Sequence, residues 1–356
     1  MFTKGRHTSL VLLLLLATLA TSAVAQKKQK KQKQPLPTGI PVLWRDPGDL
    51  ATRDLRYGPG SPELAPAPPF TYTREETTGE SPKFRVKDSR GVTWLVKRGE
   101  EAQAETVATR LIWAMGYFAD EAYYFDRAEI KNLPRLSRGQ NFIESGTTVR
   151  GARFEPKRKG VLNGANWDWE QNPFANSREL DGLKVLMVLL ANYDTTPRNN
   201  RIQLVKNAQI NQWEARYVAA DVGATLGHVG GLGGKRSKNS LSDFSSSKFV
   251  LGVENGLVKF DYDTTPKKMG MFASVFNPGY HSSQAKKEKV MKTITVGNAR
   301  WIGSMLARLS DEQLRDAFRA ANYEEATMEG FIRAFRDRIA QLNQLPSSVT
   351  MVVPKR

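Results

Sequence analysis

The feature that most restricts the fold of this 356-residue chain is a change in hydrophobic periodicity along it. In the first half, apolar residues alternate on both sides of a turn, which predicts a β-hairpin over residues 84–97. Residues 100–116 instead repeat apolar side chains at spacings of three and four, which predicts a helix ended by Gly116. The apolar run 122–125 predicts a further strand. This order, β-β-α-β, indicates a small sheet that carries one helix.

Helical patterns dominate the second half. Residues 178–191 are apolar on nearly every side and follow Ser177, a good N-cap, so they predict a buried central helix. Short strands are expected at 201–205 and 216–220. Ser310 begins a capping box, and a last helix carries apolar side chains on one face: Met328, Phe331, Phe335, Ile339 and Leu342. The sequence therefore predicts an α+β fold in which a small β-rich lobe precedes a larger, mainly helical lobe.

The N-terminus lacks a globular pattern. Residues 1–25 combine a basic start, the apolar run Leu10–Ala20 and a small-x-small site at Ala23–Ala25, which together are typical of a cleaved signal peptide. Retention of this segment as an anchor is the alternative. We therefore expect an exported protein, located in the periplasm, in the cell envelope or outside the cell.

Three further segments flank the predicted domain. Residues 26–34, QKKQKKQKQ, are too polar and too like-charged to fold, so they indicate a basic tether that can also bind an anionic surface. Residues 35–75 are read as a Pro-rich extended segment, because nine of the 18 prolines lie within 35–69. The globular domain is expected over residues 76–345, divided into 76–145 and 146–345, with 346–356 as a tail.

The residue types exclude several classes of protein. The chain has no Cys, which excludes a disulfide scaffold, a Cys-ligated metal site and a cysteine nucleophile. Its three His residues are too few for a His-rich metal site. The net charge is +17, but residues 1–33 hold seven of the basic residues and no acid, so the rest carries +10. A basic body suits an anionic partner, yet without a helix-turn-helix, RNP or zinc motif we do not expect nucleic-acid binding.

Four polar features follow the predicted elements in a definite order. Lys97 ends the strand TWLVK, and Glu105 lies in the first turns of the next helix. Asp194 and Asn199 follow the buried helix in LLANYDTTPRNN, and Asp221 begins an Asp-x-Gly turn after a strand. A Lys on a strand can neutralise phosphates, and a Glu on the facing helix can hold it by an ion pair. A carboxylate can orient an attacking hydroxyl, and amide and carboxylate oxygens are ligands that Mg²⁺ prefers.

This order resembles the protein-kinase-like superfamily and, within it, the atypical branch of the HipA-type and phosphatidylinositol kinases. The resemblance covers nearly all of the expected globular domain. It implies a bilobal kinase-like fold that binds ATP together with Mg²⁺ or Mn²⁺. By this resemblance Asp194 is the catalytic base, and Asn199 and Asp221 are the metal ligands. Lys97 then holds the phosphates, and Glu105 is its ion-pair partner.

The chain departs from this pattern around the phosphates and the base. No G-x-G-x-x-G loop precedes Lys97. The turn Asp88–Gly91 stands in its place, one strand earlier, and either its backbone amides or Arg90 are then expected to cover the phosphates. Asn192-Tyr193 replaces the usual His-Arg before the base, and Thr196 stands where HipA-type kinases often carry a His. Asn200 is an alternative to the neighbouring Asn as a metal ligand.

The glycine-rich run 227–235, GHVGGLGGK, is not a P-loop. Val229 stands where the first glycine of that motif belongs, and Arg236 stands where a Ser or Thr is needed. Its place after Asp221 indicates a polar segment in the position of a kinase activation loop. The serines that follow it are candidates for autophosphorylation: Ser237, Ser240, Ser242, Ser245, Ser246 and Ser247.

Two functions of different classes remain open from the sequence. The first is an exported phosphotransferase that moves a phosphoryl group from ATP to a protein, lipid or envelope hydroxyl, with adenylyl transfer as a variant. The second is a catalytically inactive kinase-like protein that binds an anionic envelope component. The second function would survive Asp194→Ala and would be lost when the basic tether is neutralised.

Overall fold

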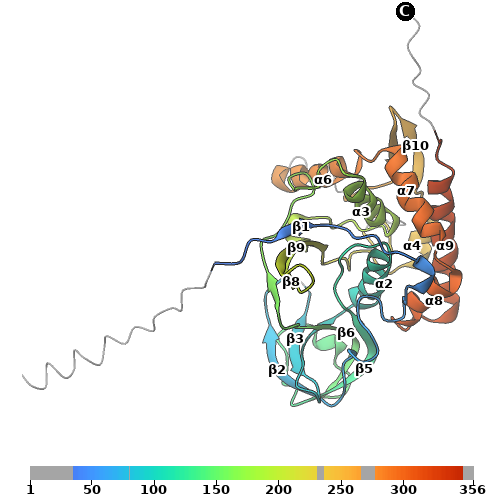
Figure 1. Cartoon of the computed structure of the whole chain (residues 1–356). Coiled ribbons are helices and arrows are strands. Elements are labelled where there is room, and N and C mark those ends of the chain that lie inside the picture. Colours follow the sequence, from blue (N-terminus) through green and yellow to red (C-terminus); the bar gives the residue numbers. More distant parts are fainter. Residues whose placement is uncertain (1–34, 80, 231–235, 266–276, 348–356) are drawn as a thin grey trace, which may run out of the picture. The chain divides into compact units, whose positions relative to one another are not determined.

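The structure, a computed structural model, describes residues 35–79, 81–230, 236–265 and 277–347 (Figure 1). The chain separates into a first unit, Met1–Pro37, and a second, Thr38–Arg356, and every contact given below lies within the second. The predicted signal peptide, the basic tether and most of the predicted C-terminal tail lie outside the described residues. No helix within the described ranges is both long enough and apolar enough to cross a membrane.

Helices and strands are mixed along the chain, which confirms the predicted α+β class. The strands are β1 (Ile40–Val42), β2 (Phe70–Glu76), β3 (Lys83–Lys87), β4 (Thr93–Arg98), β5 (Tyr123–Lys131), β6 (Thr148–Pro156), β7 (Val161–Asn163), β8 (Asn200–Asn207), β9 (Gln212–Ala219), β10 (Val250–Glu254) and β11 (Leu257–Phe260). The α-helices are α2 (Glu101–Ala114), α3 (Arg178–Leu189), α4 (Leu241–Ser246), α6 (Pro278–Met291), α7 (Val296–Ala307), α8 (Asp311–Arg319) and α9 (Glu325–Asn343). Short 3₁₀ turns lie at Leu50–Thr52, Gln140–Phe142 and Pro197–Asn199.

Five strands close into a barrel in the order β2-β3-β4-β6-β5, and a parallel pairing of β2 with β5 completes it. The predicted hairpin is confirmed: Lys87 pairs with Thr93 beside the turn, and Lys83 pairs with Lys97 at the other end. Alternate side chains fill the interior, because successive residues of a strand face opposite sides. The buried interior residues include Phe84, Val86, Trp94, Val96 and Phe154.

Helix α2 packs against the barrel strands β5 and β6 on one side and against α8 on another (Figure 1). It ends as predicted at Gly116, whose φ of 90° suits glycine. The chain before the barrel runs along this helix. Trp44 Nε1 donates to the carbonyl of Met115 at 2.7 Å, and Gln313 of α8 donates to the carbonyls of Leu50 and Arg53. The early chain is therefore part of the packing around α2.

The remainder is built on α3 and a four-stranded sheet in the order β1-β9-β8-β7. Ser177 caps α3 through the amide of Leu180, and the helix is buried along nearly its whole length, as predicted. Helix α3 packs on α7, and α7 packs on α9. The buried side chains of α3 belong to the larger hydrophobic core. The predicted capping box at Ser310 is also present, at the start of α8.

Two predicted boundaries differ from the structure. The domain was expected to begin at residue 76, but β1 pairs in parallel with β9 and β2 is a barrel strand, so the compact unit begins at Thr38. The prolines around these strands hid their short apolar alternation. The strand expected at 122–125 is the nine-residue β5, and β6 was not predicted, because charged residues interrupt its apolar pattern.

Candidate functional site

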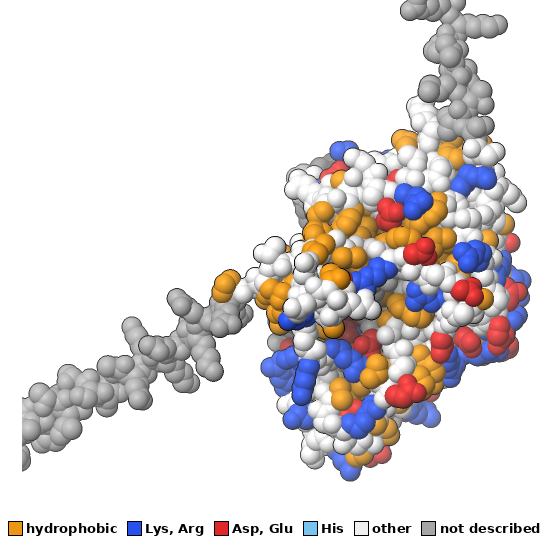
Figure 2. Space-filling model, viewed as in Figure 1, with side chains coloured by type: hydrophobic (Ala, Val, Ile, Leu, Met, Phe, Trp, Pro, Cys, Tyr) orange, Lys and Arg blue, Asp and Glu red, His pale blue; other side chains and the backbone are white. Residues whose placement is uncertain are grey.

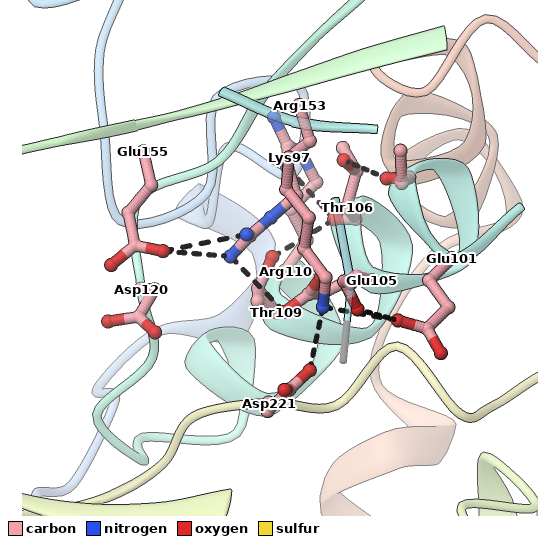
Figure 3. A network of polar contacts seen from close by, with 12 residues as sticks. Lys97, Glu101, Glu105, Thr106, Thr109, Arg110, Asp120, Arg153, Glu155 and Asp221 are labelled. Atoms are coloured by element: carbon pink, nitrogen blue, oxygen red, sulfur yellow. Dashed lines mark hydrogen bonds and ion pairs between the residues drawn. The ribbon is translucent and has the colours of Figure 1, made fainter. Parts of the chain in front are cut away.

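Successive side chains of β4 face opposite sides of the barrel wall, and this alternation sets the direction of the Lys97 side chain. Trp94 and Val96 face the barrel interior, so Lys97 points outward toward α2. There its Nζ lies 3.0 Å from Glu105 Oε2 and 3.2 Å from Glu101 Oε2. Both carboxylates lie on α2, four residues apart and therefore on one face of that helix. Strand β4 and helix α2 together place the predicted Lys–Glu pair in direct contact (Figure 3).

Lys97 also reaches the second part of the molecule. Its Nζ lies 2.7 Å from Asp221 Oδ1, although 124 residues separate the two in sequence. Burial by itself lowers the pKa of Lys97, but Glu105, Asp221 and Glu101 outweigh burial and raise it above its ordinary value. Lys97 is therefore positively charged at every physiological pH.

Glu105 has a second partner that sequence reasoning missed. Arg153 of β6 lies 3.3 Å from Glu105 Oε1, and both side chains are 2% exposed. The polar contacts continue from Arg153 to Glu155, then to Arg201 of β8 and finally to Asp120. In Figure 3 the labelled charges extend from Lys97 toward Glu155 and Asp120. The sequence hides such a residue, because a charge on the outer face of the barrel that α2 covers has the same spacing as a solvated one.

The segment after α3 is folded onto itself around Asp194. The amide of Asp194 donates to Asn192 Oδ1 at 2.9 Å, and Asn199 Nδ2 donates to the carbonyl of Asp194 at 2.8 Å. The carbonyl of Asn199 then accepts the amide of Asp221 at 3.1 Å. These bonds join three of the predicted site residues. The side chain of Asn199 is bonded to the backbone of Asp194, and the backbone of Asn199 is bonded to that of Asp221.

Asn200 is not an alternative to Asn199. Its side chain is 2% exposed and its Nδ2 donates to the carbonyl of Trp167. Consecutive residues entering a strand face opposite sides, so Asn200 is directed into the core while Asn199 stays beside Asp194. The Asn199 amide nitrogen is occupied by the Asp194 carbonyl, which leaves the amide oxygen as the donor atom for a cation.

The Asp-x-Gly turn requires its glycine for a steric reason. A Cβ atom at Gly223 would lie 2.8 Å from the Cβ of Glu101, closer than two such atoms approach. Glu101 in turn accepts from Ser81 Oγ at 3.1 Å and from Lys238 Nζ at 2.9 Å. Glu101 therefore joins the loop before β3, helix α2 and the chain that follows Asp221.

The expectation that the turn Asp88–Gly91 covers the phosphates beside Lys97 is wrong. The pairing of β3 with β4 places this turn elsewhere. The turn Asp88–Gly91 lies at the far end of β4 from Lys97, because Lys87 pairs with Thr93. Arg90 donates there to the carbonyls of Glu63 and Ala65 and does not reach Lys97. Because Lys97 pairs with Lys83, the connection next to it is the one between β2 and β3, which includes Gly79 and Ser81.

Asp194 has an ionic partner that the sequence did not indicate. Lys287 of α6 places its Nζ 3.0 Å from Asp194 Oδ1. Burial alone raises the pKa of Asp194, but Lys287 outweighs burial and lowers it below its ordinary value. Both residues line a pocket of about 660 Å³ together with Tyr193 and Arg198. A second pocket, of about 610 Å³, is lined by the charged residues Asp120, Glu155 and Arg201.

The donor atoms suit a divalent cation held together with phosphates. Asp221 has a half-exposed carboxylate, and Asn199 has an amide oxygen, both hard ligands. In the described part of the chain, no three His, Asp or Glu side chains cluster so as to hold an ion by themselves. This set fits Mg²⁺ or Mn²⁺, which take few protein ligands and complete their shell with phosphate and water. The glycine-rich run lies largely outside the described residues.

The charge on the surface is dispersed. Figure 2 shows Lys and Arg side chains over both the barrel and the helices on the face drawn, interspersed with carboxylates. Of the basic residues, Arg315 and Arg319 are paired with carboxylates on α8 and α9. On the face drawn, the basic side chains do not form a continuous stripe.

The stabilisation contributed by Glu101 is expected to depend on pH. Burial by itself raises the pKa of Glu101, but Lys97 and Lys238 outweigh burial and lower it from 4.5 to about 2. Because the folded pKa is the lower one, the stabilisation is complete above about pH 4.5 and is lost as the pH falls toward 2. Glu101→Gln should therefore reduce the melting temperature by roughly 5 °C at pH 7 and by less than half of that at pH 3.

The neighbouring residue supplies the control for this measurement. Glu100 is exposed and its side chain does not cap α2, so Glu100→Gln should leave the melting temperature unchanged at both pH values. An equal loss at pH 7 and pH 3 for Glu101→Gln would contradict the ionic origin of the effect.

Comparisons with known proteins give weak likenesses. No family model matches the chain, and no curated protein matches it. Among solved structures, it is similar to the crystal structure of a Helicobacter pylori proinflammatory kinase, CtkA, at 10% identity and a TM-score of 0.37, over 78% of this chain and 97% of that one. It is also similar to the crystal structure of the Golgi casein kinase with Mn/ADP bound, at 9% identity and a TM-score of 0.28, over 96% of this chain and 92% of that one. Likenesses this distant do not assign a function.

Proposed function

We propose that the protein is an exported, ATP-dependent phosphotransferase of bilobal kinase-like fold. In this proposal the barrel with α2 is the smaller lobe, and the part built on α3 and the β1-β9-β8-β7 sheet is the larger one. One observation carries the proposal: Lys97, from the barrel, meets Asp221, from the other part, at 2.7 Å, while Glu105 holds the same Lys. Asn199 links the other two residues, because its side chain donates to the carbonyl of Asp194 and its carbonyl accepts the amide of Asp221.

Each residue then has a defined task in the transfer of a phosphoryl group. Lys97 binds the phosphates of ATP, and Glu105 keeps the Lys side chain extended toward them. Asp221 and Asn199 would hold Mg²⁺ or Mn²⁺, which neutralises the phosphate oxygens when bound. Lys97 must leave Asp221 Oδ1 for this to occur, and its contacts with Glu105 and Glu101 keep it in place when it does. Asp194 orients the acceptor hydroxyl.

The reaction joins an acceptor oxygen to the terminal phosphorus of ATP. The acceptor O–H attacks that phosphorus, the bond to the bridging oxygen breaks, ADP leaves, and the proton passes to Asp194 and then to water. The pocket at Asp194 is the place for the acceptor, a hydroxyl on a protein, a lipid or an envelope component. Adenylyl transfer in the same site would add a nucleotide to the acceptor, and the mass of the product separates the two reactions.

The location and the surface partner rest on the sequence. The leader over residues 1–25 supports export, and the basic tether over residues 26–34 supports contact with an anionic lipid or polymer. The second candidate, an inactive kinase-like protein that binds an anionic envelope component, is favoured by the absence of a G-x-G-x-x-G loop before Lys97.

A thermal melt of residues 26–356 tests the proposal. ATP with Mg²⁺ or Mn²⁺ should raise the melting temperature by about 5 °C at saturating ligand, because a ligand that binds the folded state stabilises it. In Asp221→Ala the rise should disappear. Asp337→Ala, which removes an exposed carboxylate of α9, is the matched control and should keep the full rise.

The opposite result favours the second candidate. A wild-type protein whose melting temperature does not change with ATP and either metal would overturn the proposed phosphotransferase. Vesicles containing an anionic lipid, tested against the chain with and without residues 26–34, would then measure the alternative binding function.

A further inference from the structure

Helix α6 directs one of its lysines inward to the candidate base. Lys287 is 7% exposed and pairs with Asp194, whereas its neighbours Lys286 and Lys289 are 51% and 76% exposed. Burial of a Lys side chain is unfavourable unless the charge is paired, so the contact with Asp194 is a requirement of this packing. The two residues lie 93 positions apart in sequence, and only the docking of α6 brings them together.

Two hydrogen bonds from Thr264 hold α6 in the position that this pair needs. Glu288 Oε1 accepts both the amide and the hydroxyl of Thr264, each at 3.0 Å. Lys286 pairs with Asp168 at 3.1 Å, but it is half-exposed and does not line the pocket. Glu288, the residue next to Lys287, therefore anchors α6 beside the pocket.

The chain before α6 supports the Asp194 segment as well. The hydroxyl of Tyr262 donates to the carbonyl of Asn192 at 2.8 Å and lies 3.0 Å from Thr195 Oγ1. The residues on both sides of Asp194 are therefore held from one segment, and the Asp194 carboxylate itself is held from α6. Together these contacts fix the backbone and the side chain of the candidate base from outside its own loop.

We propose that Lys287 is a further positioning residue of the site, which sets the orientation of the Asp194 carboxylate toward the acceptor hydroxyl. This inference rests on the proposed phosphotransferase function. Lys287 holds Oδ1, so the rotation of the carboxylate is fixed before the acceptor arrives, and a misplaced base costs rate more than it costs nucleotide affinity. Lys287 pairs with Asp194, whereas Lys97 pairs with Asp221, so the phosphate end of the site is held by other contacts.

Kinetics of three variants test this role. Lys287→Met should lower kcat for phosphoryl transfer by about 30-fold or more, while the affinity for ATP with metal stays unchanged. Lys287→Arg, which keeps the charge and a donor, should recover most of the rate. Lys286→Met is the matched control, because it removes a neighbouring Lys–Asp pair on the same helix outside the pocket, and it should leave kcat unchanged.

A double-mutant cycle, measured by protein stability, distinguishes failure of this inference from failure of the proposed function. If Lys287 and Asp194 interact, the denaturant midpoints of Lys287→Met, Asp194→Asn and the double variant will not be additive. Additive midpoints, or an unchanged kcat in Lys287→Met, would overturn the positioning role even if ATP binds and transfer occurs. Parallel losses of kcat and ATP affinity that Lys287→Arg does not restore would also overturn it. Wild-type protein that does not bind ATP would instead overturn the proposed function.

Discussion

Asp194→Asn is expected to lower kcat for phosphoryl transfer by about 10³-fold while the affinity for ATP with metal is retained. Asn has the same shape as Asp and preserves the backbone bonds to Asn192 and Asn199, but it cannot accept a proton from the acceptor. Asp194 also lacks a direct contact with Lys97, so the phosphate-binding end should be intact. Transfer rates and ATP affinity measured on the same preparation check this result.

The control for Asp194→Asn is the other Asp that is paired with α6. Asp168→Asn removes the partner of Lys286 and leaves the site untouched, so it should keep the wild-type kcat. Full activity in Asp194→Asn would exclude Asp194 as the base. Loss of ATP affinity together with kcat would show that this residue supports the structure of the site as a whole.

Glu105→Gln is expected to lower the free energy of unfolding by about 3–5 kcal/mol. The carboxylate lies between Lys97 and Arg153, at 3.0 and 3.3 Å, and all three side chains are buried. Removal of its charge leaves two cations close together in a region from which water is excluded. Chemical denaturation monitored by Trp fluorescence measures the loss.

An exposed ion pair provides the comparison for Glu105. Glu312 pairs with Arg319 at the surface of α8, where solvent screens the charges, so Glu312→Gln should not shift the denaturation midpoint measurably. Glu105→Gln should in addition weaken ATP binding, because Lys97 then keeps only Asp221 and Glu101 as partners. An unchanged free energy of unfolding in Glu105→Gln would mean that the buried carboxyl is uncharged in the folded protein.

Local patterns predicted the elements that carry the candidate site. The alternation over residues 84–97 predicted the hairpin whose register directs Lys97 outward, and Ser177 predicted the start of the buried helix that precedes Asp194. The sequence also singled out Asp194 and Asn199 after that helix, and the structure joins them by a hydrogen bond. Such patterns can be read because they depend on neighbours within a few residues, where strand and helix periodicity apply.

The misplaced phosphate-covering loop shows where this reasoning fails. The turn Asp88–Gly91 was placed near Lys97 from its position in sequence, but in a hairpin the turn and the far ends of the strands are separated by the full strand length. The correct neighbour, the connection before β3, could not be identified until β2 was known to be a barrel strand. That assignment depends on the pairing of β2 with β3 and β5.

The sequence by itself determined the α+β class, the main helices and strands, and five polar residues on the elements that carry the candidate site. The tertiary structure alone decided which charges pair: Arg153 with Glu105, Arg201 with Asp120, and Lys287 with Asp194. Each of these pairs spans tens of residues, and a charged side chain that faces the interior has no local signature that separates it from one that faces water. Only the packing of the barrel, β8 and α6 brings the partners of these pairs together.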